Sequence, residues 1–330
     1  MFEIDIFMPV APKDAFKAQH SLRGILDNCL NPIRNIYIAT PERFELKELE
    51  AEEGVNLHWI LDAEFPFSVQ DLRDVFLERH STWENASWYY QQLLKFYVFE
   101  AIEGLLDHVL ILDSDFMIAR PTQFVNDHGK AMLAYGYPFK WLQGTTDYPQ
   151  EVEHIHATFA AELIPGWSPR HCYSGMQHHM LLERRIVKDL FEVVEQRWRR
   201  PFWEAFIHLV DVEKWNAAAE YVIYHHFALW RHQEKVVLRH LNACDLIFDS
   251  EEPCPSWEVI DGLAEVDAHG AVGFHGFLKL RERLATMDYI PDNLKQELLQ
   301  AQQLVFKLTL FEGTLQIAEM QQPAAYEMSY

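Results

Sequence analysis

The segment Ile111–Asp115 (Ile-Leu-Asp-Ser-Asp) ends an apolar run that begins at His108, and it places two carboxylates one residue apart. A short apolar run followed by polar residues predicts a buried strand. Because side chains at positions i and i+2 of an extended segment point the same way, Asp113 and Asp115 are expected to share one side, with Ser114 turned aside. Such a pair suits a divalent cation such as Mg²⁺ or Mn²⁺, which often shares its ligand sphere with substrate phosphates. Short Asp-x-Asp matches are common, so two solvated acids are the alternative interpretation.

The charge of the chain limits its partners. The 330 residues include 28 Lys and Arg against 50 Asp and Glu, a formal net charge of −22. A surface this acidic repels nucleic-acid phosphates and anionic lipid head groups, so we expect no nucleic acid as a partner. A nucleotide ligand remains compatible with this charge, because a metal ion and a few local cations reverse the field inside a pocket.

The cysteines and the apolar segments indicate where the protein works. Cys29, Cys172, Cys244 and Cys254 show no paired short spacing, which favours reduced thiols in a cytosolic setting. The sequence starts without a basic leader or signal-type apolar segment. It also lacks a run of about 18 apolar residues that would span a bilayer. We therefore predict a soluble, cytoplasmic protein without a transmembrane segment.

The first part of the chain alternates predicted strands and helices. Strands are expected at residues 4–10, 35–40, 57–61 and 108–112, and helices at 13–30, 42–53 and 87–105. This alternation is typical of an α/β fold whose mostly parallel central sheet is flanked by helices. In such sheets ligands gather at the carboxyl ends of the strands, where Val10, Asp62 and Asp113 fall.

The second half is predicted to be rich in helices. Periodicity favours helices at residues 186–198, 202–210, 215–232 and 292–308. Residues 308–315 fit either a hairpin or a frayed tail.

Polar residues on two predicted helices have open interpretations. Gln91, Gln92 and Lys95 lie together on one helix face, where periodicity alone makes them ordinary surface residues. Glu220 lies between Ala219 and Tyr221. It is either one more acid on a helix face or a half-buried base with a raised pKa.

The histidines do not form a recognisable ligand motif. The chain has 17 of them, including the pairs His178-His179 and His225-His226. No His-Glu-x-x-His or Cys-x-x-Cys spacing is present, so we do not predict a dedicated zinc site. The absence of a Gly-x-Ser-x-Gly elbow and of a Walker loop counts against serine hydrolases and P-loop NTPases.

Several short motifs occur in a familiar order. They are Trp88–Lys95 (Trp-Tyr-Tyr-Gln-Gln-Leu-Leu-Lys), Leu112–Asp115, Arg120-Pro121, Ser174–Met180 and Ala219–Tyr221. Together they resemble nucleotide-sugar-dependent glycosyltransferases of the GT-A fold. More narrowly, they are similar to a family of poorly characterised bacterial proteins assigned to that fold as glycosyltransferases. The resemblance covers roughly residues 1–285.

This resemblance implies a division of the chain. A GT-A-like domain would cover residues 1–285, with a nucleotide-binding half at 1–140 and an acceptor and catalytic half at 141–285. A C-terminal helix and tail would follow at 286–330.

The resemblance also implies donor-binding residues. Asp113 and Asp115 would bind Mn²⁺ or Mg²⁺, which holds the diphosphate of the sugar nucleotide; Asp115 would be the more direct ligand, and Asp113 would also reach the ribose. The complete predicted nucleotide-sugar set is Pro9, Val10, Asp14, Asp62, Gln92, Lys95, Asp113, Ser114 and Lys279. A metal and a fixed cation would stabilise the negative charge that develops on the departing diphosphate.

A late histidine would complete the metal site. His275 is the candidate, and His269 is the fallback. Some members of the fold carry His-x-x-Gly-x-x-Lys here, whereas in this chain Gly276 follows His275 directly and Lys279 lies four residues on. This departure leaves a structural histidine in a Gly-flanked turn as the alternative.

The catalytic residues implied by the resemblance are Glu220, Gln177 and His178. Glu220 would activate an acceptor hydroxyl or orient the donor sugar, and the other two would line the same cleft. The sequence thus predicts a metal-dependent glycosyltransferase that uses a nucleoside diphosphate sugar and a hydroxyl acceptor, such as a precursor of surface polysaccharide.

Two alternatives remain. A nucleotidyltransferase uses a similar sheet and acid pair but normally has a Gly-rich basic loop after its first strand, where this chain has Val10–Asp14 without glycine. A non-enzymatic interaction protein on a decayed transferase fold is the second alternative, against which the intact acid pair counts.

Overall fold

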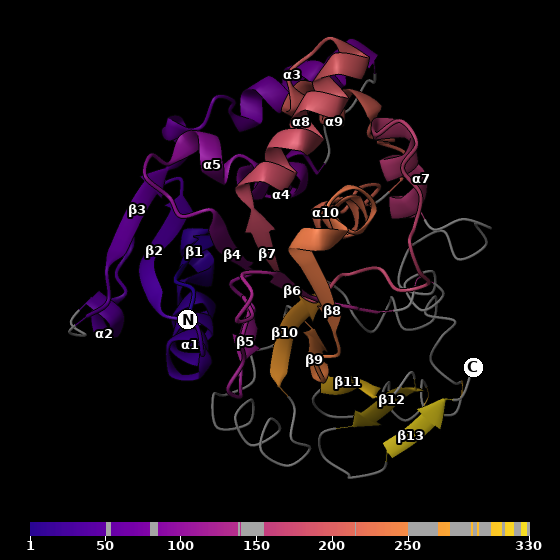
Figure 1. The fold of residues 1–330 in the computed structure, drawn as a ribbon. Helices are drawn as coiled ribbons and strands as arrows, with labels where there is room; N and C mark the ends of the chain where they lie inside the picture. Colours follow the sequence, from indigo (N-terminus) through magenta and orange to yellow (C-terminus); the bar gives the residue numbers. More distant parts are fainter. Residues whose placement is uncertain are drawn as a thin grey trace.

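The computed structural model has an α/β architecture with two main sheets (Figure 1). It describes residues 1–50, 54–79, 85–137, 139, 155–214, 216–249, 270–277, 292, 296, 305–311, 314–319 and 325–328. The predicted fold class is confirmed, because the central sheet is mostly parallel and is flanked by helices.

The first sheet has five strands in the order β3-β2-β1-β4-β7. They are β1 (Ile4–Pro9), β2 (Ile33–Thr40), β3 (Leu57–Leu61), β4 (His108–Leu112) and β7 (His179–Glu183). The first four run parallel, and β7 pairs with β4 in the antiparallel direction. The chain order reverses between β1 and β4, and this point of a doubly wound sheet is where ligands bind.

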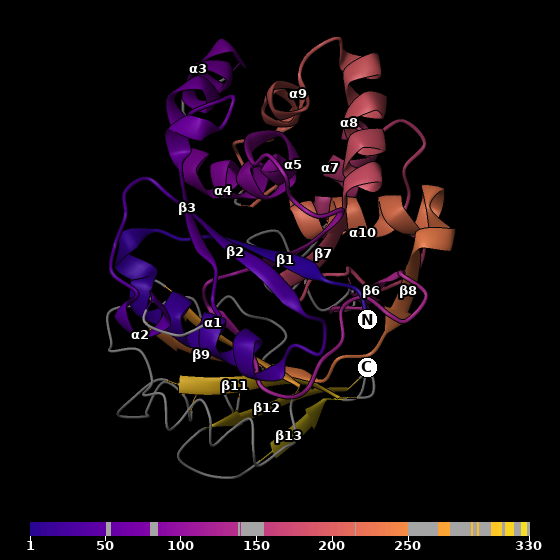
Figure 2. The same cartoon turned by 60° about the vertical axis from the view of Figure 1, so that its left-hand side comes forward.

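Helices cover both faces of this sheet (Figure 2). On one face lie α3 (Val69–Arg79), α4 (Ala86–Phe96), α5 (Val98–Ala101), α8 (Arg184–Trp198), α9 (Phe202–Leu209) and α10 (Glu220–Arg231). On the other lie α1 (Ala15–Asn28) and α2 (Lys47–Glu50). The described residues also form α7 (Ile155–Leu163) and the short 3₁₀ segments η1 (Pro12–Asp14), η2 (Asp62–Glu64) and η4 (Gln233–Lys235).

The second sheet has six strands in the order β13-β12-β11-β9-β10-β5. They are β5 (Phe116–Ile118), β9 (Ala243–Asp249), β10 (Ala271–Phe277), β11 (Val305–Phe311), β12 (Thr314–Glu319) and β13 (Ala325–Met328). A small parallel pair is formed by β6 (Ala131–Ala134) and β8 (Val236–Arg239).

The structure corrects several predicted elements. The helix predicted at 292–308 is wrong for residues 305–308, which belong to β11 and pair with β9. The hairpin alternative for residues 308–315 is confirmed by the antiparallel pairing of β11 with β12. The helix predicted at 87–105 is interrupted at Tyr97, and the one predicted at 215–232 begins only at Glu220.

Helix α1 packs tightly against β5. A Cβ atom on Gly24 would lie 2.4 Å from the Cγ atom of Met117 and 2.8 Å from the carbonyl oxygen of Ile118. One turn earlier, the Ser21 hydroxyl donates to the carbonyl oxygens of Asp113, at 3.1 Å, and Phe116. Helix α1 therefore supports the turn that carries the Asp-Ser-Asp motif.

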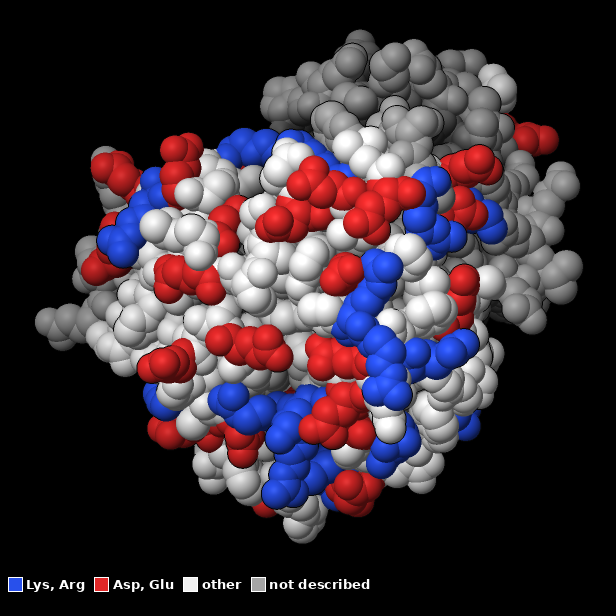
Figure 3. Space-filling view, turned by 90° about the horizontal axis from the view of Figure 1, so that it is seen from above, with Lys and Arg blue, Asp and Glu red and all other residues white. Residues whose placement is uncertain are grey.

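Acidic and basic side chains are mixed on the face seen from above, over the helices that lie at the top of Figure 1 (Figure 3). Arg200, for example, lies 2.7 Å from Glu204 and 3.9 Å from Glu78. The negative net charge is therefore not concentrated on this face. Among the described residues, no helix combines the length and apolar character needed to cross a bilayer.

Candidate functional site

Residues 113–115 form the turn between β4 and β5, which are strands of different sheets. The amide of Asp113 donates to the carbonyl of His178 at 3.0 Å, and the amide of Phe274 donates to the carbonyl of Asp115 at 2.9 Å. The segment is thus a turn and not the extended strand end that the sequence predicts. As a consequence, the two carboxylates have different nearest partners.

Asp113 belongs to a buried group that we call the Lys95 network: Lys95, Asp113, Glu220 and Tyr221. The Lys95 Nζ atom lies 2.6 Å from Oδ1 of Asp113 and 2.5 Å from Oε1 of Glu220. It also donates to the Tyr221 hydroxyl at 3.1 Å, and that hydroxyl donates to Oδ1 of Asp113 at 2.9 Å. Helices α4 and α10 therefore meet through one ammonium group beside the end of β4.

Charge pairing governs the ionisation of the Lys95 network. Burial disfavours the charged form of Lys95, but the carboxylates of Asp113 and Glu220 outweigh it and raise the pKa of Lys95. In the same way, burial is outweighed by Lys95 and His178, which hold the pKa of Asp113 below its ordinary value. Burial and the nearby Asp113 raise the pKa of Tyr221 well above its ordinary value. The lysine and Asp113 are therefore ionised at neutral pH.

Asp115 belongs to a second group, the Asp115 cluster, formed by Asp115, His178 and His275. The Nδ1 atom of His275 lies 3.1 Å from Oδ2 of Asp115, and the rings of His178 and His275 lie 4.3 Å apart between centroids. His178 also connects the two groups, because its Nδ1 atom lies 3.3 Å from Oδ2 of Asp113. It adopts a left-handed backbone conformation with φ of 54°.

The Asp115 cluster is strongly polarised. Burial lowers the pKa of His275, but the Asp115 and Asp245 carboxylates outweigh this effect and raise it to about 10. Although burial acts in the opposite direction, His275 also lowers the pKa values of Asp115 and Asp245.

The whole site has more negative than positive groups. The carboxylates of Asp113, Asp115, Glu220 and Asp245 lie around the ammonium of Lys95 and the imidazole of His275. A divalent cation would offset this excess of negative charge.

The donor set of the Asp115 cluster fits a metal ion. Each of its three residues offers one ligand atom, and these atoms lie within 4.8 Å of one another. One carboxylate and two imidazoles favour a transition metal such as Mn²⁺ over Mg²⁺, which prefers oxygen ligands alone. Both oxygens of Asp113 already have partners, because Oδ1 accepts from Lys95 and Tyr221 and Oδ2 lies 3.3 Å from Nδ1 of His178.

The residues predicted around the first strands lie at the same edge of the sheet. Pro9 ends β1 and Val10 follows it, and Asp14 closes η1, where it lies 3.6 Å from Lys17. Asp62 follows β3, which is three strand positions from β4, or about 14 Å at the usual strand spacing. Burial raises the pKa of Asp62, opposed by a hydrogen bond with Tyr90. Asp62 is therefore remote from the Lys95 network.

Two predicted glutamines help to support the site. The Gln92 amide donates to the carbonyl of Ala218 at 3.1 Å, and the Gln177 amide donates to that of Leu241 at 2.9 Å. In both, the Oε1 atom is buried without a hydrogen bond. Ser114 lies in the turn between the two aspartates.

Lys279 and His269 lie outside the described residues. The predicted roles of all these residues in binding, metal coordination and catalysis stay predictions.

Sequence reasoning missed two residues that contact the site. Asp245 lies 3.4 Å from Nε2 of His275, and the hydroxyl of Tyr137 donates to its other oxygen. One signal for Asp245 was available, because it is a single acid within the apolar run Ala243–Phe248. No local pattern marks Tyr137.

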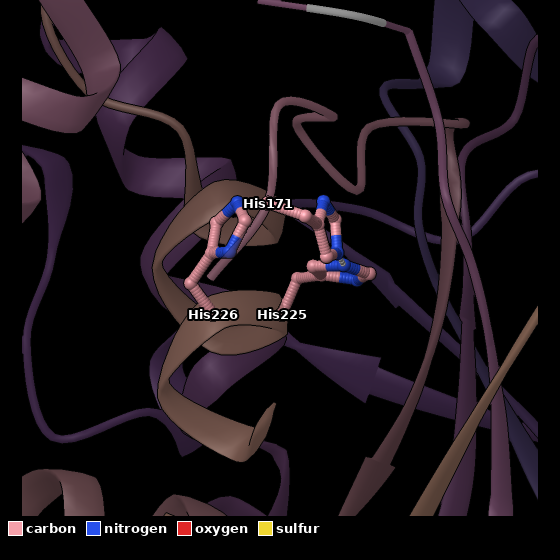
Figure 4. Close-up of side chains that lie close together, drawn as sticks. All are labelled: His171, His225 and His226. Atoms are coloured by element: carbon pink, nitrogen blue, oxygen red, sulfur yellow. Dashed lines mark hydrogen bonds between the residues drawn. The ribbon is translucent and has the colours of Figure 1, made fainter. Parts of the chain in front are cut away.

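A second group of histidines, the His171 trio, consists of His171 and of His225 and His226 on α10 (Figure 4). Ligand atoms of the three rings also lie within 4.8 Å of one another. However, backbone amides donate to Nδ1 of His171 at 3.1 Å and to Nδ1 of His226 at 3.0 Å. In neutral imidazoles this places the hydrogen on Nε2, and Nε2 of His171 lies 3.0 Å from Nε2 of His225.

The His171 trio therefore consists of neutral rings, of which His171 and His225 are hydrogen-bonded to each other. Burial lowers the pKa of His226 to about 3 and that of His225 well below its ordinary value. The hydrogens on Nε2 of His171 and His226 occupy positions that a metal ion would need.

Comparisons with known proteins find structural similarity only. No protein-family model matches the chain, and no curated protein matches its sequence. The fold is similar to mouse xyloside xylosyltransferase 1 in its apo form, with a TM-score of 0.42 and 11% identity over 82% of this chain and 97% of that one.

The fold is also similar to the galactosyltransferase LgtC. The structure of an active-site mutant of LgtC gives a TM-score of 0.43 and 11% identity over 89% of this chain and all (100%) of that one. The complex of LgtC with donor and acceptor sugar analogs gives a TM-score of 0.33 and 14% identity, over 62% of this chain and 70% of that one. These similarities are distant, and they assign no residue role, ligand or activity to this chain.

Proposed function

We propose that the protein is a metal-dependent glycosyltransferase that moves a sugar from a nucleoside diphosphate sugar to an acceptor hydroxyl. The observation that carries this proposal is the turn at residues 113–115. There the Asp115 cluster, which fits a cation, lies next to the buried cation of Lys95 at the carboxyl end of β4. A metal ion and a fixed positive charge together stabilise the negative charge that develops on a departing diphosphate.

Each group has a role in this proposal. Asp115, His178 and His275 hold Mn²⁺, which when bound supplies charge stabilisation to the diphosphate. Asp113 fixes Lys95 through Oδ1 and contacts the metal ligand His178 through Oδ2. Glu220, at the first turn of α10, is held by Lys95 and orients the donor sugar or the acceptor hydroxyl. The spacing of the cysteines adds a cytoplasmic setting, and the resemblance found in the sequence adds a bacterial one and an acceptor from surface polysaccharide synthesis.

A thermal-shift panel tests this function. Nucleoside diphosphate sugars are added singly, with and without Mn²⁺, to the wild type and to Asp115→Ala. One donor is expected to raise the melting temperature only with Mn²⁺, because a ligand at 100 times its Kd stabilises by about 2.7 kcal/mol. The rise should be absent in Asp115→Ala and present in Asp189→Ala, whose carboxylate pairs with Arg231 elsewhere.

Two outcomes contradict the proposal. A flat panel for every donor would favour a non-enzymatic interaction protein. Release of pyrophosphate from a nucleoside triphosphate and a sugar phosphate, without transfer from any sugar nucleotide, would favour the nucleotidyltransferase.

A further inference from the structure

The pairing of β9 with β10 places Asp245 beside His275. Gly273 is the register partner of Asp245, and His275 lies two residues farther on the same strand face. A Cβ atom on Gly273 would lie 2.3 Å from Oδ1 of Asp245 and 2.4 Å from Nε2 of His275. The contact between these two side chains therefore requires glycine at position 273.

Each of the two ring nitrogens of His275 faces a different carboxylate. Nδ1 faces Asp115 at 3.1 Å, and Nε2 lies 3.4 Å from Oδ1 of Asp245. Nε2 is buried and makes no hydrogen bond of good geometry, and the Asp245 carboxylate is the ion-pair partner that it faces. Because the carboxylates lie on opposite sides of the ring, Asp245 cannot share an ion that binds Nδ1.

Tyr137 fixes Asp245 from the other side. The side chain of Asp245 is 9% exposed, and its Oδ2 atom accepts a hydrogen bond from the Tyr137 hydroxyl. Burial and Asp245 raise the pKa of Tyr137 well above its ordinary value, so the hydroxyl keeps its hydrogen at neutral pH. It therefore remains a donor to Oδ2 of Asp245. The other oxygen is left facing His275.

We propose that Asp245 is a positioning residue that holds His275 with its hydrogen on Nε2, so that Nδ1 is free to bind a divalent cation, and that Tyr137 fixes Asp245 for this task. This inference rests on the proposed function, because it assumes a cation at the Asp115 cluster. A metal-bound imidazole uses one nitrogen for the ion, and a carboxylate at the other nitrogen sets the tautomer and the ring orientation.

Asp245→Asn gives the main test, with Mn²⁺ affinity measured by the electron paramagnetic resonance of free Mn²⁺. The Tyr137 hydroxyl holds the amide oxygen, so the amide NH₂ faces Nε2 of His275. That donor forces the ring hydrogen onto Nδ1 and blocks the metal. We expect Mn²⁺ affinity to fall by about 10- to 100-fold.

The double variant Asp245→Asn/Tyr137→Phe separates positioning from simple damage. Without the hydroxyl, the amide is free to turn its oxygen toward Nε2, so part of the lost Mn²⁺ affinity should return. A purely structural role predicts the opposite, because two changes would weaken the site more than one. Asp5→Asn is the matched control: Asp5 is buried and paired with Arg34 at the other end of β1, and this change should leave Mn²⁺ affinity unaltered.

The outcomes distinguish this inference from the proposed function. If the wild type binds no Mn²⁺, the proposed function fails. If the wild type binds Mn²⁺ and Asp245→Asn binds it equally well, the positioning role is overturned and the metal site stands. If Asp245→Asn does not fold, nitrogen NMR of wild-type His275 loaded with Zn²⁺ decides. Hydrogen on Nε2 is expected, and hydrogen on Nδ1 would overturn the inference.

Discussion

The Lys95 network and the Asp115 cluster share one turn but differ in how their charges are satisfied. In the Lys95 network the side chains of Lys95 and Glu220 are 5% and 9% exposed, and every charge has a close partner. In the Asp115 cluster the side chains of Asp115 and His178 are 29% and 31% exposed. The first group is thus complete as it stands, whereas the second is open to a further ligand. The difference suggests that the Lys95 network fixes the geometry and the Asp115 cluster binds.

The largest expected effect comes from Lys95→Met. This change keeps the bulk of the side chain but leaves Asp113 and Glu220 without their shared cation. Breaking a buried ion pair by removing one partner costs about 3–5 kcal/mol. Urea denaturation should show this loss, and Lys188→Met, which removes an exposed lysine 3.9 Å from Glu192, should change stability by less than about 1 kcal/mol. Equal losses of stability in the two variants would contradict a special structural role of the Lys95 network.

The histidines extend the comparison to pH. His275 lies beside carboxylates and has a raised pKa, whereas His226 lies among His171, His225 and Arg170 and has a pKa lowered to about 3. Because unfolding returns His226 to its ordinary pKa of about 6.5, the unfolded state binds more protons below that pH. The free energy of unfolding is therefore unaffected by the titration of His226 above pH 6.5. As the pH falls from 6.5 toward 3, the titration of His226 lowers it by at most about 1.4 kcal/mol per pH unit.

Thermal melts between pH 8 and pH 5 measure this decline. His226→Gln should show a smaller loss of stability over this range than the wild type. His128→Gln, at an exposed histidine, should behave like the wild type. Parallel curves for His226→Gln and the wild type would show that the His171 trio does not control acid sensitivity.

Tyr221→Phe sharpens the description of the Lys95 network. The change removes a hydroxyl that donates to Oδ1 of Asp113 at 2.9 Å and accepts from Lys95 at 3.1 Å. Since Lys95 keeps both carboxylates, the expected loss is only about 1–3 kcal/mol, as for a hydrogen bond to a charged group. Urea denaturation measures it. A loss as large as that of Lys95→Met would mean that the tyrosine, and not the lysine, holds the network together.

Asp115→Ala should have the smallest effect on stability. Its carboxylate is partly exposed, and its removal relieves repulsion with Asp113 while costing the contact with His275. We expect a change within about 1 kcal/mol in metal-free protein. A loss of several kcal/mol in metal-free urea denaturation would place Asp115 among the structural residues and would remove the distinction between the two groups.

In the first sheet, strands β1 to β4 were predictable because each is a local apolar run, whereas β7 was not predicted. The second sheet was not predictable, since its strands β5, β9, β10 and β11 come from distant parts of the chain and pair only in the fold. Residues 305–308 have an ambiguous local pattern, and pairing with β9 decides it in favour of a strand. Local periodicity cannot anticipate such long-range pairing.

The site divides in the same way. The sequence marked Lys95, Asp113 and Glu220, which lie within hydrogen-bonding distance of one another or of a shared partner. It missed the role of Asp245, because only the register of β9 with β10 places it beside His275. It also expected Asp113 and Asp115 to point to the same side and to bind the same ion. The turn at 113–115 separates their surroundings, and no pattern in the sequence predicts the direction in which a turn bends.

That turn has a mechanical consequence. Only three residues connect β4 with β5, and three residues span at most about 11 Å when fully extended. At this end of the molecule the two sheets therefore cannot slide apart without reshaping the segment that carries both aspartates. A ligand that holds residues 113–115 in one conformation also restricts the movement of the two sheets relative to each other. Ligand binding at this turn is therefore coupled to the rigidity of the protein.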